Sequence, residues 1–330
     1  MPCLYVTEQG AVLRKSGDRV IVQKEDAVLG DVPADVDTIL LYGNVQMTSH
    51  AVAEILQHGI EVSFFSLGGK LHGHLTPNHP KNIVLRMRQY EIVHDRPGAL
   101  HMAQAVVRGK VRNAAAVLRR YHKNHPAAIS LAEVHAVEEC IPRADQATSL
   151  EELLGVEGNA AARYFESFAA MAPPAAGFTG RNRRPPRDPM NALLSFGYVL
   201  IGNELQSLLD GMGFDPYIGF YHQVEYGRPS LAVDLLEEFR APLVDRFSIN
   251  LFNLGVLSAA DFEDTPEGGV LLRHEAKKRF FAALEKELTT SIALDGEELS
   301  FRALFRRQSE RLARSLVDRV PYESFRWPAS

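Results

Sequence analysis

Three segments of the chain carry residues whose types and spacing could bind a metal ion or a phosphate. In the first, Glu166 follows a run of alanines, and small side chains one helical turn away leave open space around a carboxylate. In the second, His222 lies between an apolar run and the turn residues Gly227 and Pro229, where a loop is expected. A neutral imidazole in a loop is a common metal ligand and a titratable base.

The third segment is a predicted helix that begins at Ser230 and carries Asp234, Glu237 and Glu238. Residues three and four apart share one face of a helix, so these side chains form an acidic face opposite a leucine-rich stripe. One imidazole nitrogen and two or three carboxylate oxygens suit Mg²⁺ or Mn²⁺ better than copper or a thiolate-bound zinc.

Each of these residues also has an ordinary structural interpretation when it is taken alone. Glu166 could pair with Arg163, three residues earlier on the same helix face. His222 could be satisfied by a backbone carbonyl in a partly buried loop. Repulsion among carboxylates on a solvated helix costs only a few tenths of a kcal/mol, so the acidic face does not prove metal binding.

Basic residues gather in two stretches. Residues 81–124 hold ten Lys and Arg against Glu91 and Asp95, which leaves an excess of eight positive charges. A second stretch places four arginines within seven positions, and two prolines keep it extended. These arginines are Arg181, Arg183, Arg184 and Arg187. A guanidinium fork matches phosphate oxygens well, although such a stretch is also typical of a solvated loop.

The elements that must position these residues change character near residue 77. Before it, short strands alternate with turn signals around one helix at 49–57, and after it apolar residues recur at helical spacing. Helices are expected over 83–121 with an interruption at 96–98, and over 131–140, 159–171, 191–209, 230–254, 271–288 and 301–317. The sequence therefore predicts an α+β protein: a small N-terminal β-rich domain (1–77), a linker (78–82) and a larger all-α domain (83–330).

Composition indicates a globular protein rather than a disordered or membrane-spanning one. The 330 residues are 46% hydrophobic with a net charge of -5. The longest apolar candidate, residues 193–202, is half of the roughly 20 residues that a membrane span needs, and the N-terminus lacks a signal-peptide pattern. We therefore expect a cytoplasmic protein with no membrane partner. Cys3 and Cys140 are too few for a disulfide framework and are expected to be thiols.

Four blocks of sequence, in the same order, resemble one known family. They are residues 157–166, 181–198, 213–222 and 227–240, which begin Glu157-Gly-Asn, Arg181-Asn-Arg, Gly213-Phe-Asp and Gly227-Arg-Pro. Together they resemble the CRISPR-associated integrases and endonucleases called Cas-one, and the layout outside the blocks agrees with that family. The resemblance spans essentially the whole chain.

The resemblance implies a homodimer that joins through its β-rich domain in the prokaryotic cytoplasm. It implies that double-stranded DNA is captured and inserted into a CRISPR array as new spacers, together with a small dimeric partner called Cas-two. The family's metal site has one Glu, one His and one acidic residue, which match Glu166, His222 and Glu237 here. Asp234, one turn earlier, is a fourth polar member that either binds Mg²⁺ or Mn²⁺ directly or only orients the site.

A metal held by these three residues would stabilise charge on a reacting phosphodiester. Attack by a DNA 3′-hydroxyl gives integration, and attack by water gives cleavage. In this setting the expected DNA-binding residues are Arg163, Arg181, Arg183, Arg184 and Arg187. Two alternatives remain: a non-catalytic DNA-binding scaffold, and a metal-dependent hydrolase of small phosphoesters.

Overall fold

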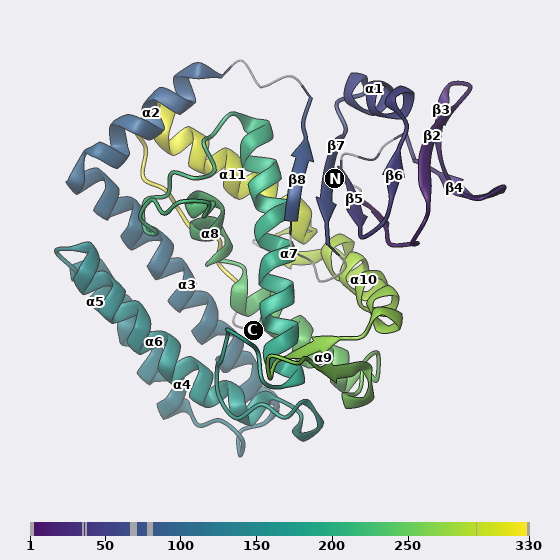
Figure 1. Cartoon of the computed structure of the whole chain (residues 1–330). Helices are drawn as coiled ribbons and strands as arrows, with labels where there is room; N and C mark the ends of the chain where they lie inside the picture. The colour runs from purple at the N-terminus through teal and green to yellow at the C-terminus, as the bar shows by residue number, and fades with distance from the viewer. Residues whose placement is uncertain are drawn as a thin grey trace. The chain divides into compact units, whose positions relative to one another are not determined.

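The structure is a computed structural model of the chain, and it describes residues 3–34, 36, 38–66, 71–77, 82–294 and 296–328. It divides into two compact units, Met1–Pro80 and Lys81–Ser330. The division falls within the predicted linker, residues 78–82, of which 78–81 lie outside the described residues. The first unit is β-rich and the second is mostly helical, as Figure 1 shows.

The N-terminal unit contains two four-stranded sheets and the helix α1 (Ser49–Gln57). The first sheet has the order β1-β5-β7-β8, with strands Cys3–Val6, Thr38–Tyr42, Glu61–Phe65 and Leu71–Leu75. The second has the order β4-β3-β2-β6, with strands Ala27–Asp31, Arg19–Lys24, Val12–Ser16 and Gln46–Met47. Strands β1, β5 and β7 are parallel, and β8 closes that sheet antiparallel to β7.

The core of this unit forms where short apolar strands and α1 bury their side chains together. All five residues of β5 are buried, and Leu13, Ile39 and Val62 are among the completely buried side chains. The sequence did not predict β4, whose five residues are all exposed. A strand without a buried face lacks the apolar alternation on which such a prediction depends.

The second unit is built from ten α-helices, two short hairpins and three brief 3₁₀ or π segments within the described residues. The helices are α2 (Ile83–His94), α3 (Arg96–Asn124), α4 (Leu131–Glu138), α5 (Cys140–Gln146), α6 (Leu150–Met171), α7 (Pro189–Met212), α8 (Ser230–Leu236), α9 (Arg246–Asn253), α10 (His274–Thr289) and α11 (Phe301–Asp318). The hairpins are β9–β10 (Phe262–Asp264, Val270–Leu272) and β11–β12 (Ile292–Leu294, Glu297–Leu299). The predicted all-α domain is therefore helical with two small β additions.

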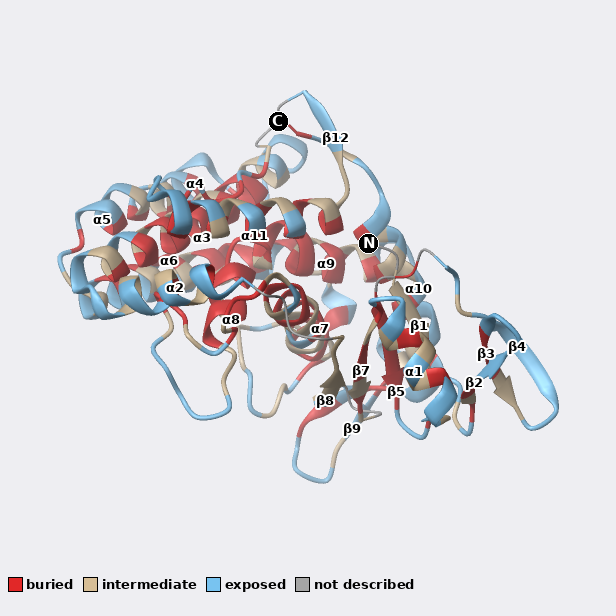
Figure 2. Ribbon diagram, turned by 90° about the horizontal axis from the view of Figure 1, so that it is seen from above, coloured by how far each residue is buried: buried red, intermediate tan, exposed pale blue. Residues whose placement is uncertain are grey.

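Helix α3 is the central element of this unit. It contacts α2, α4, α5, α6, α8 and the π-helical segment η2 (Arg240–Asp245). Buried residues gather along α3, α6 and α11 in Figure 2. The predicted interruption at 96–98 is the start of α3, because the Asp95 side chain caps the Gly98 N–H and Pro97 is tolerated in a first turn.

Helix α6 begins at Leu150, nine residues before the predicted start. The Ser149 side chain accepts from the Glu152 N–H and caps the helix. Two glycines, Gly155 and Gly158, weakened the helical pattern in the sequence, yet both lie inside the helix. The longer helix places Glu157 on a rigid element instead of in a loop.

One described helix, α7, is long and apolar enough to cross a membrane by length and composition alone. Its most apolar window is 61% buried inside the structure. The apolar run predicted from the sequence, residues 193–202, is only the middle part of this helix and is therefore half the length of a membrane span. A mostly buried helix of this kind is typical of the core of a helical domain.

The chain ends in a segment without regular structure, residues 319–328, which we call the C-terminal strap. Its Phe325 ring stacks on Phe239 with centroids 5.3 Å apart, and Trp327 stacks on Phe301 at 5.7 Å. A Cβ atom at position 109 would lie 2.5 Å from the Ser324 Cβ. Glycine at position 109 therefore lets the strap approach α3.

Asn113, on α3, fastens the strap with its side chain. The amide nitrogen donates to the carbonyl oxygens of Glu238 (2.8 Å) and Phe325 (3.0 Å), and its oxygen accepts from the Trp327 N–H (2.8 Å). Asn113 is completely buried, so each bond satisfies a backbone group that water cannot reach.

We expect Asn113→Ala to lower the free energy of unfolding of the helical unit by about 3 kcal/mol, because it leaves three buried backbone groups without a partner. Trp327 is the protein's single tryptophan, so urea unfolding followed by tryptophan fluorescence reports on this unit. Asn124→Ala, at an exposed position on the same helix, is the control. Equal stability of the two variants would contradict this account of the strap.

Candidate metal site

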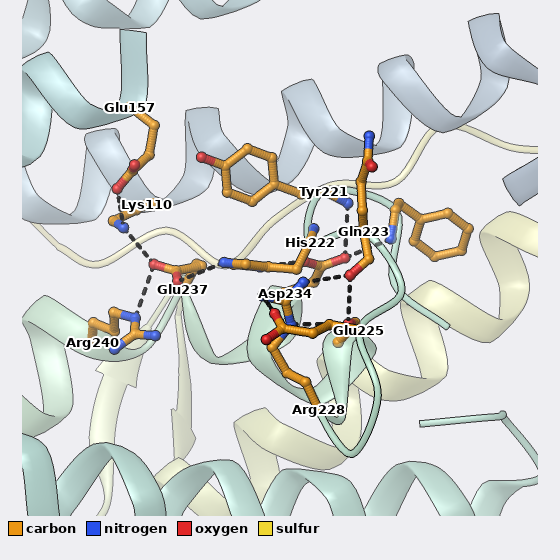
Figure 3. A network of polar contacts seen from close by, with 12 residues as sticks. Lys110, Glu157, Tyr221, His222, Gln223, Glu225, Arg228, Asp234, Glu237 and Arg240 are labelled. Atoms are coloured by element: carbon orange, nitrogen blue, oxygen red, sulfur yellow. Dashed lines mark hydrogen bonds and ion pairs between the residues drawn. The ribbon is translucent and has the colours of Figure 1, made fainter. Parts of the chain in front are cut away.

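The Asp234 carboxylate organises the loop that carries His222. Its Oδ2 accepts the backbone N–H groups of Phe220 (2.6 Å) and Tyr221 (3.0 Å). Its Oδ1 accepts the His222 N–H (2.9 Å) and bonds the same residue's ring Nδ1 (2.7 Å). Figure 3 shows the imidazole between Asp234 and Glu237. An ionised acceptor that is 1% exposed and makes four such bonds fixes both the loop and the ring.

Glycine at position 219 makes this loop possible. A Cβ atom there would lie 2.8 Å from Asp234 Oδ2, from the His222 carbonyl oxygen and from the Ser230 carbonyl carbon. Two of these neighbours are backbone atoms, which cannot move aside cheaply. The sequence Gly219-Phe-Tyr-His222 therefore wraps around the Asp234 carboxylate because its first residue has no side chain.

Asp234 also determines which nitrogen of His222 is available. A carboxylate at Nδ1 favours the tautomer in which Nδ1 carries the proton, so Nε2 presents its lone pair. That Nε2 lies 3.9 Å from Glu237 Oε1. Both Asp234 oxygens already accept two donors each, so this carboxylate holds the loop and the ring in position.

Glu237 follows the last residue of α8 and is 3% exposed. Its Oε2 pairs with Arg240 Nε (2.9 Å) and with Lys110 Nζ (2.6 Å). Burial opposes ionisation of this carboxyl, but the charges of Arg240, Lys110 and His222 outweigh it and lower the pKa of Glu237 to about 2. Glu237 is therefore a carboxylate at any physiological pH.

Glu157 joins this cluster from α6, although the sequence analysis did not select it. Lys110 Nζ contacts Glu157 Oε1 as well as Glu237, so one ammonium group connects the two carboxylates. Figure 3 shows Lys110 between them. A signal was present in the sequence: the alanine argument applied to Glu166 applies equally to Glu157, with Ala160 and Ala161 one turn later.

The structure does not bring Glu166 to the cluster. Glu166 lies nine positions after Glu157 on the same helix. At 100° per residue, nine positions place the two side chains on opposite faces, about 14 Å apart along the axis. Glu166 is exposed, whereas Glu157 is half-buried against Lys110.

The donor chemistry of the cluster fits a divalent cation. Its oxygen donors belong to Glu157 and Glu237, and His222 Nε2 supplies a nitrogen. The 3.9 Å between His222 Nε2 and Glu237 Oε1 lies between the separations of about 3 and 4.2 Å expected for neighbouring and opposite ligands with ~2.1 Å bonds. Among the described residues no three acidic, histidine or cysteine side chains already stand close enough to hold an ion. Lys110 lies between two of the donors.

A small hollow, partly open to solvent, adjoins the cluster. Lys110, Arg183 and Arg240 line it together with small and aromatic side chains. The Arg240 guanidinium lies over the Tyr198 ring, 4.3 Å from its centroid. Deeper in the wall, burial raises the pKa of Asp245 to about 6, although two tyrosine hydroxyls donate to it.

The arginines predicted to bind DNA fall into two groups. Arg181 turns inward, donates to Asn191 Oδ1 (2.7 Å) and Ser195 Oγ (3.2 Å), and burial lowers its pKa. Arg183, Arg184 and Arg187 are exposed. Arg163, the fifth arginine predicted to bind DNA, is half-buried and donates to Asn159 Oδ1 at 3.0 Å. The exposed three are the residues available to an external phosphate.

Part of the positive charge in residues 81–124 is neutralised within the protein. Arg108 pairs with Asp145 at 2.7 Å, and Arg119 pairs with Glu138 at 2.6 Å. Lys110 is also paired, as described above. The excess of eight positive charges in the sequence is therefore partly offset within the fold, because acidic partners come from other segments.

Comparison with known proteins places this arrangement in context. Residues 4–286 match the family model described as CRISPR associated protein Cas1. The chain is 36% identical to CRISPR-associated endonuclease Cas1 3 of Thermus thermophilus, covering 98% of this chain and 96% of that protein. It is 34% identical to a CRISPR-associated exonuclease Cas4/endonuclease Cas1 fusion of Geobacter sulfurreducens, of which it spans 60%.

Solved structures share the fold. A casposase bound to integration product matches with a TM-score of 0.87 at 24% identity, covering 100% of this chain and 94% of that one. A Cas1 protein from Thermotoga maritima matches with a TM-score of 0.83 at 24% identity, covering 98% and 100%. A Cas6-RT-Cas1–Cas2 complex matches with a TM-score of 0.81 at 25% identity, covering 98% of this chain and 36% of that one.

We expect Asp234→Asn to destabilise the helical unit by about 2–4 kcal/mol, because an amide cannot accept all four hydrogen bonds and turns N–H groups toward N–H donors. Urea unfolding followed by Trp327 fluorescence measures the loss. Nitrogen NMR of the His222 ring should also show a loss of the Nδ1–H tautomer. Asp318→Asn, at an exposed position on α11, is the control. An unchanged tautomer would contradict the positioning role.

Proposed function

This chain belongs to the Cas1 family of CRISPR-associated proteins, and from that premise we propose that it is an endonuclease and integrase that inserts DNA fragments into a CRISPR array. The observation that carries the proposal is the cluster in which Lys110 pairs with both Glu157 and Glu237 while His222 Nε2 lies 3.9 Å from Glu237 Oε1. Relatives more than 30% identical over nearly the whole chain are named endonucleases, which supports a nuclease chemistry.

We propose Glu157, His222 Nε2 and Glu237 as the ligands of one Mg²⁺ or Mn²⁺ ion. Glu157 takes the place that the sequence analysis gave to Glu166. When bound, the ion supplies positive charge that stabilises a phosphodiester during displacement. Three protein ligands leave positions for water and phosphate, and their number does not support a second ion.

The chain's own residues have separate tasks in this proposal. Asp234 holds the Nδ1 proton of His222 and keeps Nε2 directed at the cation position. Arg183, Arg184 and Arg187 contact the DNA backbone from the exposed loop, since guanidinium groups bind phosphate oxygens in pairs. Integration and cleavage then differ only in the attacking oxygen, which is a DNA 3′-hydroxyl in the first case and water in the second.

The same proposal includes partners. Double-stranded DNA is the substrate, and the match to a complex that contains Cas1 and Cas2 supports Cas2 as a partner. We place the protein in the prokaryotic cytoplasm, where these molecules meet. For a homodimer through the β-rich unit, strand β4 offers an edge: it ends its sheet and exposes Val28 and Leu29.

The other functions considered receive less support. A non-catalytic scaffold does not need a buried, ionised carboxylate beside an oriented imidazole. A hydrolase of small phosphoesters leaves the exposed arginines without a role. The endonuclease names of the relatives favour neither alternative.

Joining of a short duplex to a supercoiled, array-bearing plasmid, with Cas2 and Mn²⁺, tests the ligand set. We expect Glu157→Gln, His222→Ala and Glu237→Gln each to lower joined product by about 100-fold or more, because each removes a metal ligand. Glu166→Gln should stay within about twofold of the parent protein, since it changes an exposed residue on the opposite helix face. Loss of joining in Glu166→Gln with full joining in Glu157→Gln would reverse the assignment.

DNA binding should weaken steeply as salt rises, with a slope set by the phosphates that are neutralised. The double variant Arg183→Ala/Arg184→Ala should make that log–log slope shallower by about 0.9 for each phosphate contact that is lost. Fluorescence anisotropy of a labelled duplex at several salt concentrations measures it. Arg314→Ala, which removes one exposed charge from α11, is the control. An unaltered slope in the double variant would remove the loop from the DNA interface.

A further inference from the structure

We propose that Lys110 is an internal counter-ion that occupies the cation position of the site in the metal-free protein and is displaced when a divalent ion binds. This inference rests on the proposed metal site and adds a competitor to it. It assigns a role to a residue that neither the sequence motifs nor the ligand chemistry had singled out.

The position of Lys110 carries the inference. Its Nζ lies 2.6 Å from Glu237 Oε2 and also contacts Glu157 Oε1, so one ammonium group bridges two carboxylates from different helices. The Lys110 side chain is 19% exposed, Glu157 18% and Glu237 3%. At such partial burial two carboxylates without a cation between them repel each other strongly.

Arg240, the other cation of the cluster, does not have this role. It pairs with Glu237 at 2.9 Å, and its guanidinium is held over the Tyr198 ring. Among the described residues Lys110 is the one cation paired with both Glu157 and Glu237. Its ammonium is a compact charge on a flexible four-carbon stem, and it can therefore leave without a change in the backbone.

Space into which the Lys110 side chain can move lies beside the site. The same side chain lines the hollow beside the site, together with Arg183 and Arg240. A divalent ion that takes the position between Glu157 and Glu237 repels the ammonium and directs it toward this space. Metal binding then adds a positive charge to the wall that already carries two arginines.

Competition between Lys110 and a metal ion for the two carboxylates should lower the apparent affinity for the metal. While Lys110 holds the carboxylates, only the fraction of molecules with the position open can bind metal, so the apparent affinity is reduced by that fraction. Removing the charge but keeping the length of the side chain should tighten metal binding. It should also destabilise the metal-free protein, because Glu157 and Glu237 then face each other without the ammonium group that lies between them.

The test is Mn²⁺ binding to the full-length protein, measured by calorimetry and by the electron paramagnetic resonance signal of free Mn²⁺. We expect Lys110→Met to bind Mn²⁺ about tenfold more tightly, to melt at a lower temperature without metal, and to gain more from Mn²⁺ than the parent protein. Lys123→Met is the matched control, because it removes an exposed charge from the same helix. Lys110→Gln repeats the measurement if Lys110→Met does not yield folded protein.

Unchanged or weaker Mn²⁺ binding in the Lys110 variants would overturn the inference, because a competitor can only be lost with a gain in affinity. Glu157→Gln provides the separate check on the site itself. If Glu157→Gln binds Mn²⁺ as the parent protein does, the proposed metal site is incorrect. If Glu157→Gln loses binding while Lys110→Met equals the parent, only the role of Lys110 is incorrect.

Discussion

The whole site depends on one buried carboxylate that accepts four hydrogen bonds. Asp234 receives three consecutive backbone N–H groups and the His222 ring, and in a medium of low dielectric these charge-assisted bonds are strong. The loop cannot shift without leaving this charge unsatisfied. Helix α8, which carries Asp234, therefore determines the position of an imidazole that belongs to another segment.

A second constraint is that the Glu237 carboxylate must stay ionised although it is buried. Two cations, Lys110 and Arg240, pair with Glu237 and offset the cost of its burial. Because such pairs form inside the protein, the net charge of -5 does not reveal how charge is distributed around the site. Cations that are conspicuous in the sequence are partly neutralised in the fold, whereas Arg183, Arg184 and Arg187 stay exposed to an external anion.

The sequence was sufficient for the general organisation and for one side of the site. The change from period-two to helical spacing near residue 77 lies close to the division between the two units. The 222–237 region was also predictable, because the acidic residues share one helix and the loop before it is marked by turn residues. The sequence left Asp234 as either a ligand or an orienting residue, and its four hydrogen bonds favour the orienting role.

Glu157 could not be chosen from its neighbours alone. The helix predicted from the sequence starts at residue 159, after Glu157, whereas the cap at Ser149 starts it earlier. The choice between Glu157 and Glu166 also depends on which face of α6 meets α3, and that is a tertiary contact. In the same way, nothing local distinguishes the inward Arg181 from the outward Arg183, since only the Asn191 and Ser195 side chains draw the first into the protein.

Two consecutive glutamates between α8 and η2, Glu237 and Glu238, make different contacts. Glu237 pairs with the cations of the site, while Glu238 accepts from Tyr322 Oη, the Phe325 N–H (2.6 Å) and Gln308 Nε2 (3.0 Å). Burial raises the pKa of Glu238 to about 7 in spite of these bonds. Because one peptide unit joins the two residues, the contacts that hold the strap on Glu238 also restrain the backbone that carries Glu237.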